Sequence, residues 1–458
     1  MTTSNSQLHS SIPPIVDSDV KPTQIFQLGL VLRLSTFQIG SAMGDILTAG
    51  VWNRIMISDF GIPAWPVGLL LALKYFMAPV SLWIGYRSDT KPLFGQYRTS
   101  YIWLGRGAIL LSLLFLGFST VQLEDNTGNV VGWAAAVFCF LLYGLGTLFS
   151  ASPYLALVRD SAPREKQGVS IGIAETMLIA FFPVVAIGFS RMLTSYDPAL
   201  FWRLIFFVII VGGLFWFFAV VGVEKRNKTI TQAAHRVKQV DLQATFRKIW
   251  QDKRTRRFFI FLFVATFAAW MQDNILEPLG ADIFKMAVEE TTRLGSYWGT
   301  ATILVLVASF VIWRKKLPEE QAGIAGFGLA IMGLGMLFLA GSALAGEEHL
   351  FLTALVVFGA GFGFYTFGGL SLMAAMSPDP HAGAYLGLWT VATLVSKGLG
   401  TFIGGVSRDV VLALSHGFPL AYGVTCVIAG IGLFAAVWIL RGVNVPEFVR
   451  EAAAEMKQ

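Results

Sequence analysis

The sequence is poor in charge and in cysteine for its length. Only 14% of its 458 residues are Asp, Glu, Lys or Arg, against roughly 25% in an average soluble domain. The two cysteines, Cys139 and Cys426, each lie inside an apolar run and provide no disulfide or metal framework. Such sparse charge cannot cover a soluble globule of this size, so a soluble protein is excluded.

Catalytic signatures are also missing. The chain has no glycine loop followed by Lys-Ser/Thr, no His-Glu-x-x-His and no cysteine pair, so we predict no catalytic residues, no metal site and no enzyme. The five histidines are predicted to lie in a tail, in loops or at a membrane edge: His9, His235, His349, His381 and His416. No imidazole is therefore expected at the membrane midplane to serve as a permanent axial ligand of a metal macrocycle.

Apolar residues dominate instead, with 55% hydrophobic residues and a mean hydropathy of +0.65. A bilayer core about 30 Å thick needs roughly 20 apolar residues per helix, and runs of that length recur along the whole chain. We predict spans near 35–55, 65–85, 101–121, 131–155, 169–192, 200–223, 258–279, 296–313, 323–344, 350–376, 385–407 and 418–440. The predicted fold is an all-α membrane protein with twelve transmembrane helices.

A basic loop divides these spans into two bundles of six helices. We predict five segments: a disordered cytoplasmic tail (1–28), an N-terminal bundle (29–223), a cytoplasmic basic linker (224–257), a C-terminal bundle (258–441) and a cytoplasmic tail (442–458). The linker carries much of the net charge of +6, which favours membrane lipid over nucleic acid as its partner. Its amphipathic stretch fits an interfacial helix or an ordinary connector equally well.

The loops alternate in charge. One set contains Lys and Arg, and the opposite set contains most of the acidic loop residues. Because basic loops stay in the cytoplasm, we predict that both termini are cytoplasmic.

The two bundles show traces of duplication. Asp45 in the first span and Asp273 in the seventh stand in similar strings, 228 residues apart. A second match, at an offset of 215, pairs Gly144, Gly146, Pro163 and Gly168 with Gly359, Gly361, Pro378 and Gly383. Together these matches favour a repeated six-helix unit of the kind that two-bundle transporters contain.

A short loop between the second and third spans contains Gly85, Arg87, Asp89 and, at its end, Arg98. It resembles the Gly-x-x-x-Asp loop of the major facilitator superfamily, in which a glycine allows close helix approach and an acid meets a helix N-terminus. The alternative is a generic basic loop.

Ionisable residues within spans cost about 3 kcal/mol or more at the bilayer centre, so they are functional candidates. The candidates for a cavity or ligand site, with neighbouring polar residues, are Asp45, Asn53, Arg54, Glu175, Gln272, Asp273, Glu277 and Lys397. For Lys74 and Arg106, snorkelling or a structural ion pair is at least as good an explanation.

Several strings resemble the PucC/LhaA family, from the first span to the eleventh. They are Asn53-Arg54-Ile55-Met56-Ile57 with Gly61-Ile62-Pro63, Arg87-Ser88-Asp89-Thr90, Arg98-Thr99-Ser100-Tyr101-Ile102, Asp160-Ser161-Ala162-Pro163, Gly387-Leu388-Trp389 and Gly404-Gly405-Val406-Ser407-Arg408-Asp409. Two residues depart from the expected pattern: Ser100 stands where the family is expected to have proline, and Lys397 places a cation in the eleventh span.

The resemblance implies a bacteriochlorophyll-delivery branch of the major facilitator superfamily. Such a protein would assist light-harvesting antenna assembly in the inner or intracytoplasmic membrane of a phototrophic bacterium. (Bacterio)chlorophyll would be its transient cargo, and antenna polypeptides or the reaction-centre complex its partners. The pigment's magnesium would be met by water, a backbone carbonyl or an amide such as Asn53 or Gln272.

Two other functions remain open at this stage. A proton-coupled secondary transporter of a small solute would use Asp45 and Asp273 as proton or substrate groups. A purely structural scaffold would never open between its bundles.

Overall fold

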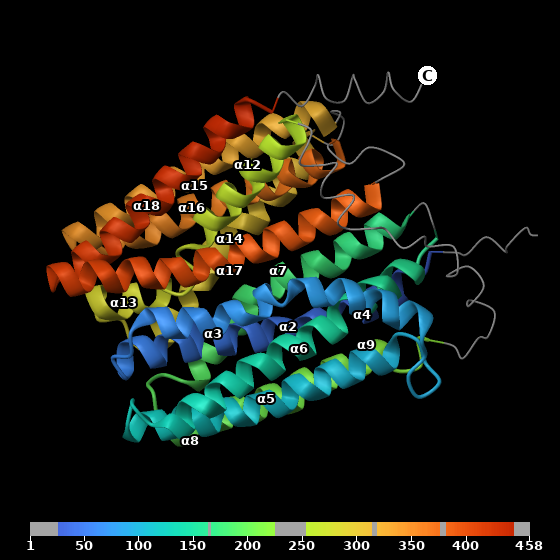
Figure 1. Cartoon of the computed structure of the whole chain (residues 1–458), viewed down its shortest axis with the longest axis horizontal. Helices are drawn as coiled ribbons and strands as arrows, with labels where there is room; N and C mark the ends of the chain where they lie inside the picture. The colour runs from blue at the N-terminus through green and yellow to red at the C-terminus, as the bar shows by residue number, and fades with distance from the viewer. Residues whose placement is uncertain (1–25, 164–165, 225–252, 314–317, 376–381, 444–458) are drawn as a thin grey trace, which may run out of the picture.

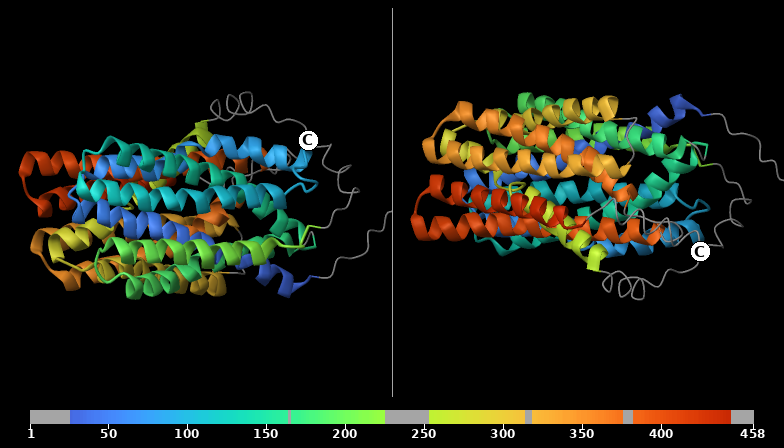
Figure 2. Two further views of the ribbon diagram at one scale, coloured as in Figure 1. Left: turned by 90° about the horizontal axis from the view of Figure 1, so that it is seen from below. Right: turned by 90° about the horizontal axis from the view of Figure 1, so that it is seen from above.

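The computed structural model consists of helical rods that run side by side (Figures 1 and 2). It describes residues 26–163, 166–224, 253–313, 318–375 and 382–443. Twelve rods lie within these ranges, which confirms the predicted number. Apart from a few positions at their edges, two kinds of predicted segment fall outside the described residues: the terminal tails and the amphipathic stretch of the linker. The boundaries of the five predicted segments stay predictions.

Six rods precede the linker, and we call them the N-half. Their elements are α1 (Leu28–Ser35), α2 (Phe37–Asp45), η1 (Ile46–Trp52) and η2 (Ile55–Asp59) in the first rod, α3 (Ala64–Phe76) and α4 (Ala78–Thr90) in the second, then α5 (Thr99–Asp125), α6 (Val130–Asp160) and α7 (Gln167–Met192), and finally α8 (Pro198–Phe207), η4 (Val208–Gly212) and α9 (Gly213–Val220) in the sixth.

Six further rods follow the linker and form the C-half. They are α12 (Lys253–Trp270) with α13 (Leu276–Phe284), α14 (Val288–Trp313), α15 (Pro318–Ala345), α16 (Glu348–Ala375), α17 (Ala382–Ser415) and α18 (Phe418–Arg441).

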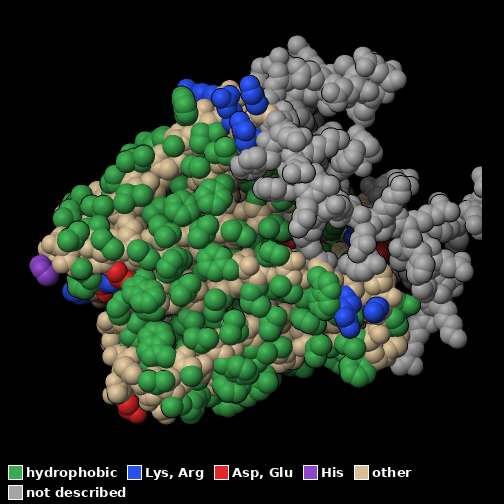
Figure 3. Space-filling view, viewed as in Figure 1, with side chains coloured by type: hydrophobic (Ala, Val, Ile, Leu, Met, Phe, Trp, Pro, Cys, Tyr) green, Lys and Arg blue, Asp and Glu red, His purple; other side chains and the backbone are tan. Residues whose placement is uncertain are grey.

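Among the described residues, nine helical spans are long and apolar enough to cross a membrane. The first and seventh rods are interrupted within the bundle, and α17 carries charged residues along its length. Many apolar side chains lie on the outer surface of the bundle and contribute to the high mean hydropathy of the chain. Those of Leu214, Ile431 and Trp438, for example, are more than 60% exposed. In Figure 3 apolar side chains cover the visible flank, while charged ones gather toward its two ends. A surface of this kind suits lipid and not water.

The first rod changes its winding halfway along. After α2 the chain continues as two π-helical stretches, η1 and η2, a winding that is often found at functional sites. A Cβ atom added to Gly44, just before the change, would lie 2.8 Å from the hydroxyl of Tyr143 on α6. The glycine therefore allows α6 to approach the rod at the level of Asp45.

Each half packs around its own buried apolar cluster. One cluster runs from Leu34 to Val220 and includes only Val288 from the C-half. The other runs from Phe258 to Val443. The halves meet where α3 lies against α17 and α7 against α14 (Figure 1).

Two equivalent glycine contacts support the predicted duplication. A Cβ atom on Gly146 would lie 2.5 Å from the carbonyl oxygen of Gly105, so α6 packs closely on α5. A Cβ atom on Gly361 would lie 2.8 Å from the carbonyl oxygen of Gly328, so α16 packs closely on α15. The fourth rod of each half thus uses the matching glycine to approach the third.

The bundle has two ends, which we name for use below. At the linker end lie residue 224, just after the end of α9, and Lys253, the first residue of α12. The far end contains the turn between η2 and α3 and the ends of α7, α13 and α17 that point away from the linker.

Candidate functional site between the two halves

A carboxylate and an ammonium form an ion pair in the middle of the N-half. The Nζ atom of Lys74, on α3, lies 2.8 Å from Oδ1 of Asp45, and the hydroxyl of Tyr143 donates to the same oxygen at 3.2 Å. The Asp45 side chain still keeps 33% of its exposure, against 14% for Lys74. Lys74 therefore takes part in an ion pair, and Asp45 stays partly accessible.

A second ammonium approaches the same layer from the C-half. Nζ of Lys397, on α17, lies 3.3 Å from the ring centroid of Trp270 and 4.9 Å from that of Tyr75. Lys74 also approaches Tyr75, with its Nζ 5.1 Å from the ring centroid. The ring of Tyr75 therefore links the two lysines, one from each half.

Two more of the predicted residues lie inside the N-half. The guanidinium of Arg106 is buried over the rings of Phe37 and Trp216, at 4.2 and 4.6 Å from their centroids. Glu175 on α7 accepts a long hydrogen bond of 3.5 Å from the amide of Gln38. Arg106 therefore rests on aromatic rings and not in an ion pair within the described chain.

Toward the far end, amide side chains connect the two halves. Nδ2 of Asn53 donates to the backbone oxygen of Asn274 at 2.9 Å, and Nδ2 of Asn274 donates to the backbone oxygen of Ala64 at 3.2 Å. Both asparagines are fully buried, and their Oδ1 atoms have no hydrogen-bond partner among the described residues. Gln272 is also buried, on the turn that links α12 to α13.

The remaining acidic candidates have unequal surroundings. Oδ2 of Asp273 accepts a hydrogen bond of 3.1 Å from the hydroxyl of Thr401 on α17. Glu277 lies opposite Gly50, where an added Cβ atom would be 3.9 Å from its Oε1. Its Oε2 is buried without a hydrogen-bond partner among the described residues. Asp273 and Asp45 occupy matching spans, but of these two only Asp45 faces a described ammonium at hydrogen-bond distance.

Arg54 lies at the far end of the first rod. It forms an ion pair with Asp59, and its Nη2 donates to the backbone oxygen of Met286 in the C-half at 3.4 Å. This predicted ligand residue therefore contributes to the contact between the halves.

A buried ion-pair network on the C-half side also belongs to the far end. Arg408 lies 2.9 Å from Asp282 and 2.8 Å from Asp409, and the hydroxyl of Tyr422 donates to Asp282. Arg408 and Asp282 keep only 5% and 9% of their side-chain exposure. Asp409 in turn accepts from the backbone N–H of Trp65, on α3, at 2.7 Å, so the network extends into the N-half.

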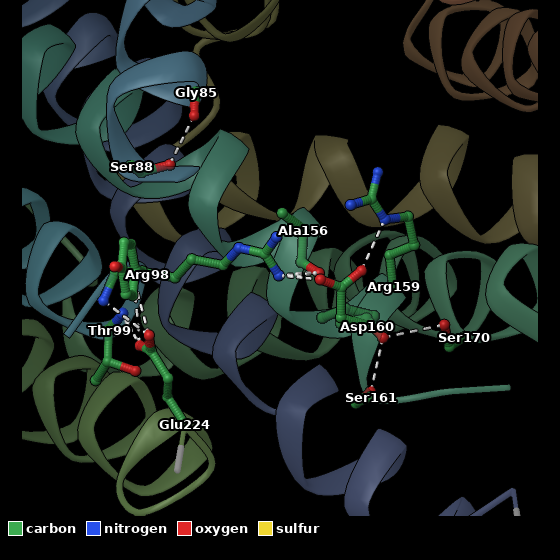
Figure 4. A network of polar contacts seen from close by, with 12 residues as sticks. Gly85, Ser88, Arg98, Thr99, Ala156, Arg159, Asp160, Ser161, Ser170 and Glu224 are labelled. Carbon is green, nitrogen blue, oxygen red and sulfur yellow. Dashed lines mark hydrogen bonds and ion pairs between the residues drawn. The ribbon is translucent and has the colours of Figure 1, made fainter. Parts of the chain in front are cut away.

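The predicted loop motif lies at the linker end, inside the N-half (Figure 4). An added Cβ atom on Gly85 would lie 3.6 Å from Cβ of Ser152 on α6, and the guanidinium of Arg87 lies over the Trp83 ring. Arg98 forms an ion pair with Asp160, at the end of α6. The side chain of Asp89 falls outside the described set.

A carboxylate from the sixth rod completes this end of the N-half. Glu224 accepts from the backbone N–H groups of Tyr97, Arg98 and Thr99, at 2.8, 3.1 and 2.7 Å (Figure 4). Negative charge at a helix N-terminus is stabilising, so Glu224 holds the start of α5 against the sixth rod.

The structure thus separates the predicted residues into three levels. Asp45 and Lys397 lie in the central layer, Asn53, Arg54, Gln272 and Glu277 lie nearer the far end, and Gly85, Arg87 and Arg98 lie at the linker end. The sequence did not identify the partners Tyr75, Tyr143, Trp270, Asn274 and Asp282. Asn274 follows Asp273 in the duplicated string, but nothing in that string indicates a contact with Ala64.

The fold defines the class of protein. In shape the chain is similar to a mutant form of the nucleoside transporter NupG, with a TM-score of 0.66 and 11% identity over 90% of this chain and 99% of that one. The chain is a multi-pass membrane protein with the major facilitator fold, which confirms the predicted fold class.

The sequence then defines the family. The family model described as PUCC protein matches residues 51–448, so the chain belongs to the PucC family, as its motifs predicted. Protein PucC of Rhodovulum sulfidophilum is 30% identical over 84% of this chain and 86% of that protein. The "Bacteriochlorophyll synthase 44.5 kDa chain" of Rhodobacter capsulatus is 27% identical over 87% and 91%.

Proposed function

We propose that this protein is a non-enzymatic assembly factor that binds a (bacterio)chlorophyll and delivers it to light-harvesting antenna polypeptides. The observation that carries the proposal is membership of the PucC family across residues 51–448. The name of the Rhodobacter capsulatus relative adds a link to bacteriochlorophyll.

The fold supports a transient carrier. A chlorophyll is a flat apolar ring that partitions into lipid, so a two-bundle protein can take it up sideways from the bilayer. Of the five histidines, the structure describes His349 and His416, and both lie at the far end and not in the central layer. Neither of these two residues therefore brings an imidazole to the central layer.

The two amides suggested for magnesium are poorly placed for a large ring. Asn53 has an Oδ1 without a described partner, but the residue is fully buried between the halves, and Gln272 is 5% exposed. Either amide would reach a pigment only after the far end has parted.

The proposal places the protein in the inner or intracytoplasmic photosynthetic membrane, with both termini in the cytoplasm and antenna or reaction-centre polypeptides as partners. Among the described residues, the linker end contains Arg33, Arg87, Lys91, Arg98, Arg159, Lys166, Arg257 and Arg441 beside Asp160 and Glu224, whereas fewer basic residues, such as Arg54, Lys285, Arg293 and Arg408, lie at the far end. This distribution supports the orientation.

The test is purification of the tagged protein from pigmented phototrophic membranes. We expect the absorption spectrum of a chlorophyll in the purified fraction, together with antenna or reaction-centre subunits. A tagged, unrelated multi-pass protein from the same membranes is the control. A colourless preparation without these subunits contradicts the proposal.

A second candidate is a proton-coupled carrier of a small solute, favoured by one observation. Asp45 is a partly exposed carboxylate in the middle of the bundle, paired with Lys74 and Tyr143. If this candidate holds, changing Asp45 and Asp273 to Asn abolishes solute uptake in vesicles. Unchanged uptake and growth with reduced antenna levels would reject it.

A further inference from the structure

The first and seventh rods, which occupy equivalent positions in the two halves, meet near the far end. Nδ2 of Asn53 donates to the backbone oxygen of Asn274 at 2.9 Å. This oxygen is available because residue 278, four positions later, is proline and has no N–H group to donate to it. Glu277 follows Asn274 on the seventh rod, and a Cβ atom added to Gly50 on the first rod would be 3.9 Å from its Oε1. The carboxyl of Glu277 therefore belongs to the contact between the halves.

This contact contains buried oxygen atoms to which no described group donates. They are Oδ1 of Asn53, Oδ1 of Asn274 and Oε2 of Glu277. Both amide nitrogens are already used, one on the backbone oxygen of Asn274 and the other on that of Ala64. A buried acceptor without a donor costs free energy. Among the described residues, the contact is therefore short of hydrogen-bond donors.

The charged side chains around Glu277 are engaged elsewhere. α13 packs on η2, α14 and α18. On these elements and their neighbours the described partners are Arg54 with Asp59, Arg293 with Glu289, Arg408 and Tyr422 with Asp282, Lys285 with the backbone oxygen of Asp282, Glu290 with the backbone N–H of Ala287, and Lys397 with the ring of Trp270. Asp273, four positions before Glu277, acts on it electrostatically with charge of the same sign. No described cation lies at ion-pair distance from Glu277.

An ionised Glu277 is therefore unfavourable in this conformation. Part of the side chain keeps some exposure, but its Oε2 does not. A buried carboxylate without a cation partner is costly, and such a group takes up a proton instead. The protonated carboxyl also gains an O–H group that donates a hydrogen bond, which is what this contact lacks. Asp45 differs, because Lys74 neutralises it by direct contact and no proton is needed.

We propose that Glu277 is a proton-binding site, occupied in the conformation described, and that its proton helps to hold the two halves together at the far end. The inference goes beyond the proposed function, because it applies whatever cargo the protein carries. When the first and seventh rods part, water reaches the carboxyl, solvates its charge and takes the proton. Opening of the far end thus releases one proton, and closure binds one. Closure is therefore favoured at low pH and is lost as the pH rises.

The test follows opening of the far end as the pH changes. The Ala64→Cys protein, purified at full length in neutral detergent, is labelled with a maleimide over about pH 5 to 9. The labelling rate is divided at each pH by that of the same cysteine in a Glu277→Gln background, because glutamine has the shape of the neutral carboxyl but does not titrate. The ratio also removes the pH dependence of the thiol itself. We expect a ratio near one at low pH and a rise of at least about fivefold at high pH.

A control variant and a second measurement accompany the ratio. Glu347→Gln makes the same substitution at an exposed far-end position and should leave the pH dependence unchanged. Infrared difference spectra between low and high pH should show loss of the C=O stretch of a protonated carboxyl in the unmodified protein. Glu277→Gln should lack this change, and Glu277→Asp should keep it at a shifted frequency, which assigns the band even where the glutamine variant does not fold.

The outcomes are separate from those of the pigment proposal. A labelling ratio that stays near one over the whole range overturns the inference, and so does an infrared change that persists in a folded Glu277→Gln variant. A ratio that responds to sodium ion and not to pH also overturns it, since the unpartnered oxygens would then hold a metal cation. Pigment and subunits in the purified fraction are unaffected by any of these results.

Discussion

The two ends of the bundle use their polar residues differently. At the far end, side-chain hydrogen bonds cross from one half to the other, for example from Asn53 to Asn274 and from Trp65 to Asp409. At the linker end, the described contacts of Arg98 and Glu224 stay within the N-half, and Arg257 bonds to Gly442 within the C-half.

This difference indicates where the halves can part. If the halves move apart at the linker end, the described hydrogen bonds at the far end can stay intact, because both partners of each bond lie at the far end. Separation at the far end breaks several bonds at once, and it exposes buried groups such as Asn274. Among the described residues, the far end therefore has more hydrogen bonds between the halves than the linker end has.

The largest expected effect comes from removing the cation of the far-end network. Arg408→Leu leaves Asp282 buried without its charge partner, and loss of one member of a buried ion pair costs about 3–5 kcal/mol. We expect the apparent melting temperature of the purified protein, followed by tryptophan fluorescence, to fall by several degrees.

The control for this prediction is an exposed pair at the linker end. Arg159 and Asp160 keep 48% and 40% of their side-chain exposure, and such pairs contribute about 0–1 kcal/mol. Arg159→Leu should therefore change the melting temperature little. Equal losses in the two variants would show that the far-end network is no stronger than a surface contact.

A smaller effect is expected from a methyl group between the halves. A Cβ atom on Gly68 would lie 2.4 Å from Nδ2 of Asn274, the atom that bonds to Ala64. Overpacking of this kind costs about 1–3 kcal/mol. Gly68→Ala should loosen the far end, so a cysteine placed at Ala64, which is fully buried, should react several-fold faster with a maleimide.

Two features of the chain make this measurement clean. The native Cys139 and Cys426 are buried, at 0% and 2% exposure, so background labelling is low. Gly107→Ala is the control, because an added Cβ atom at Gly107 meets no atom within 4 Å. Labelling that is equally fast in both variants would mean that Gly68 does not set the distance between the halves.

The sequence predicted the number of rods and the fold class because lipid imposes them. Each crossing needs a long apolar run, and a charge within such a run is conspicuous, so Asp45 and Lys397 could be identified without a structure. The change from α-helical to π-helical winding in the first rod could not be predicted, because the mostly apolar residues of Ile46–Trp52 are equally compatible with both windings.

The contact partners of the candidate residues could not be predicted either, because the apolar pattern does not show which rods meet. Asn274 meets Ala64 across 210 positions, and Lys397 meets Trp270 on another rod. Such pairs depend on how the two halves dock, and an apolar pattern leaves that docking open. The similar strings around Asp45 and Asp273 predicted equivalent positions in the two halves but not the different partners of the two carboxylates.

The smallest expected effect concerns the N-terminus of α5, where the comparison between the ends can be sharpened. Glu224→Gln keeps an acceptor for the N–H groups of residues 97–99 but removes the charge, which is worth about 0.3–1 kcal/mol at a helix N-terminus. We expect a slightly lower melting temperature and an unchanged labelling rate at the Ala64 cysteine, because Glu224 acts within the N-half. Glu347→Gln, at an exposed position of the far end, is the matched control and should change neither quantity. Faster labelling in the Glu224→Gln variant would contradict the separation, since it would mean that a contact inside the linker end of one half also controls the tie between the halves.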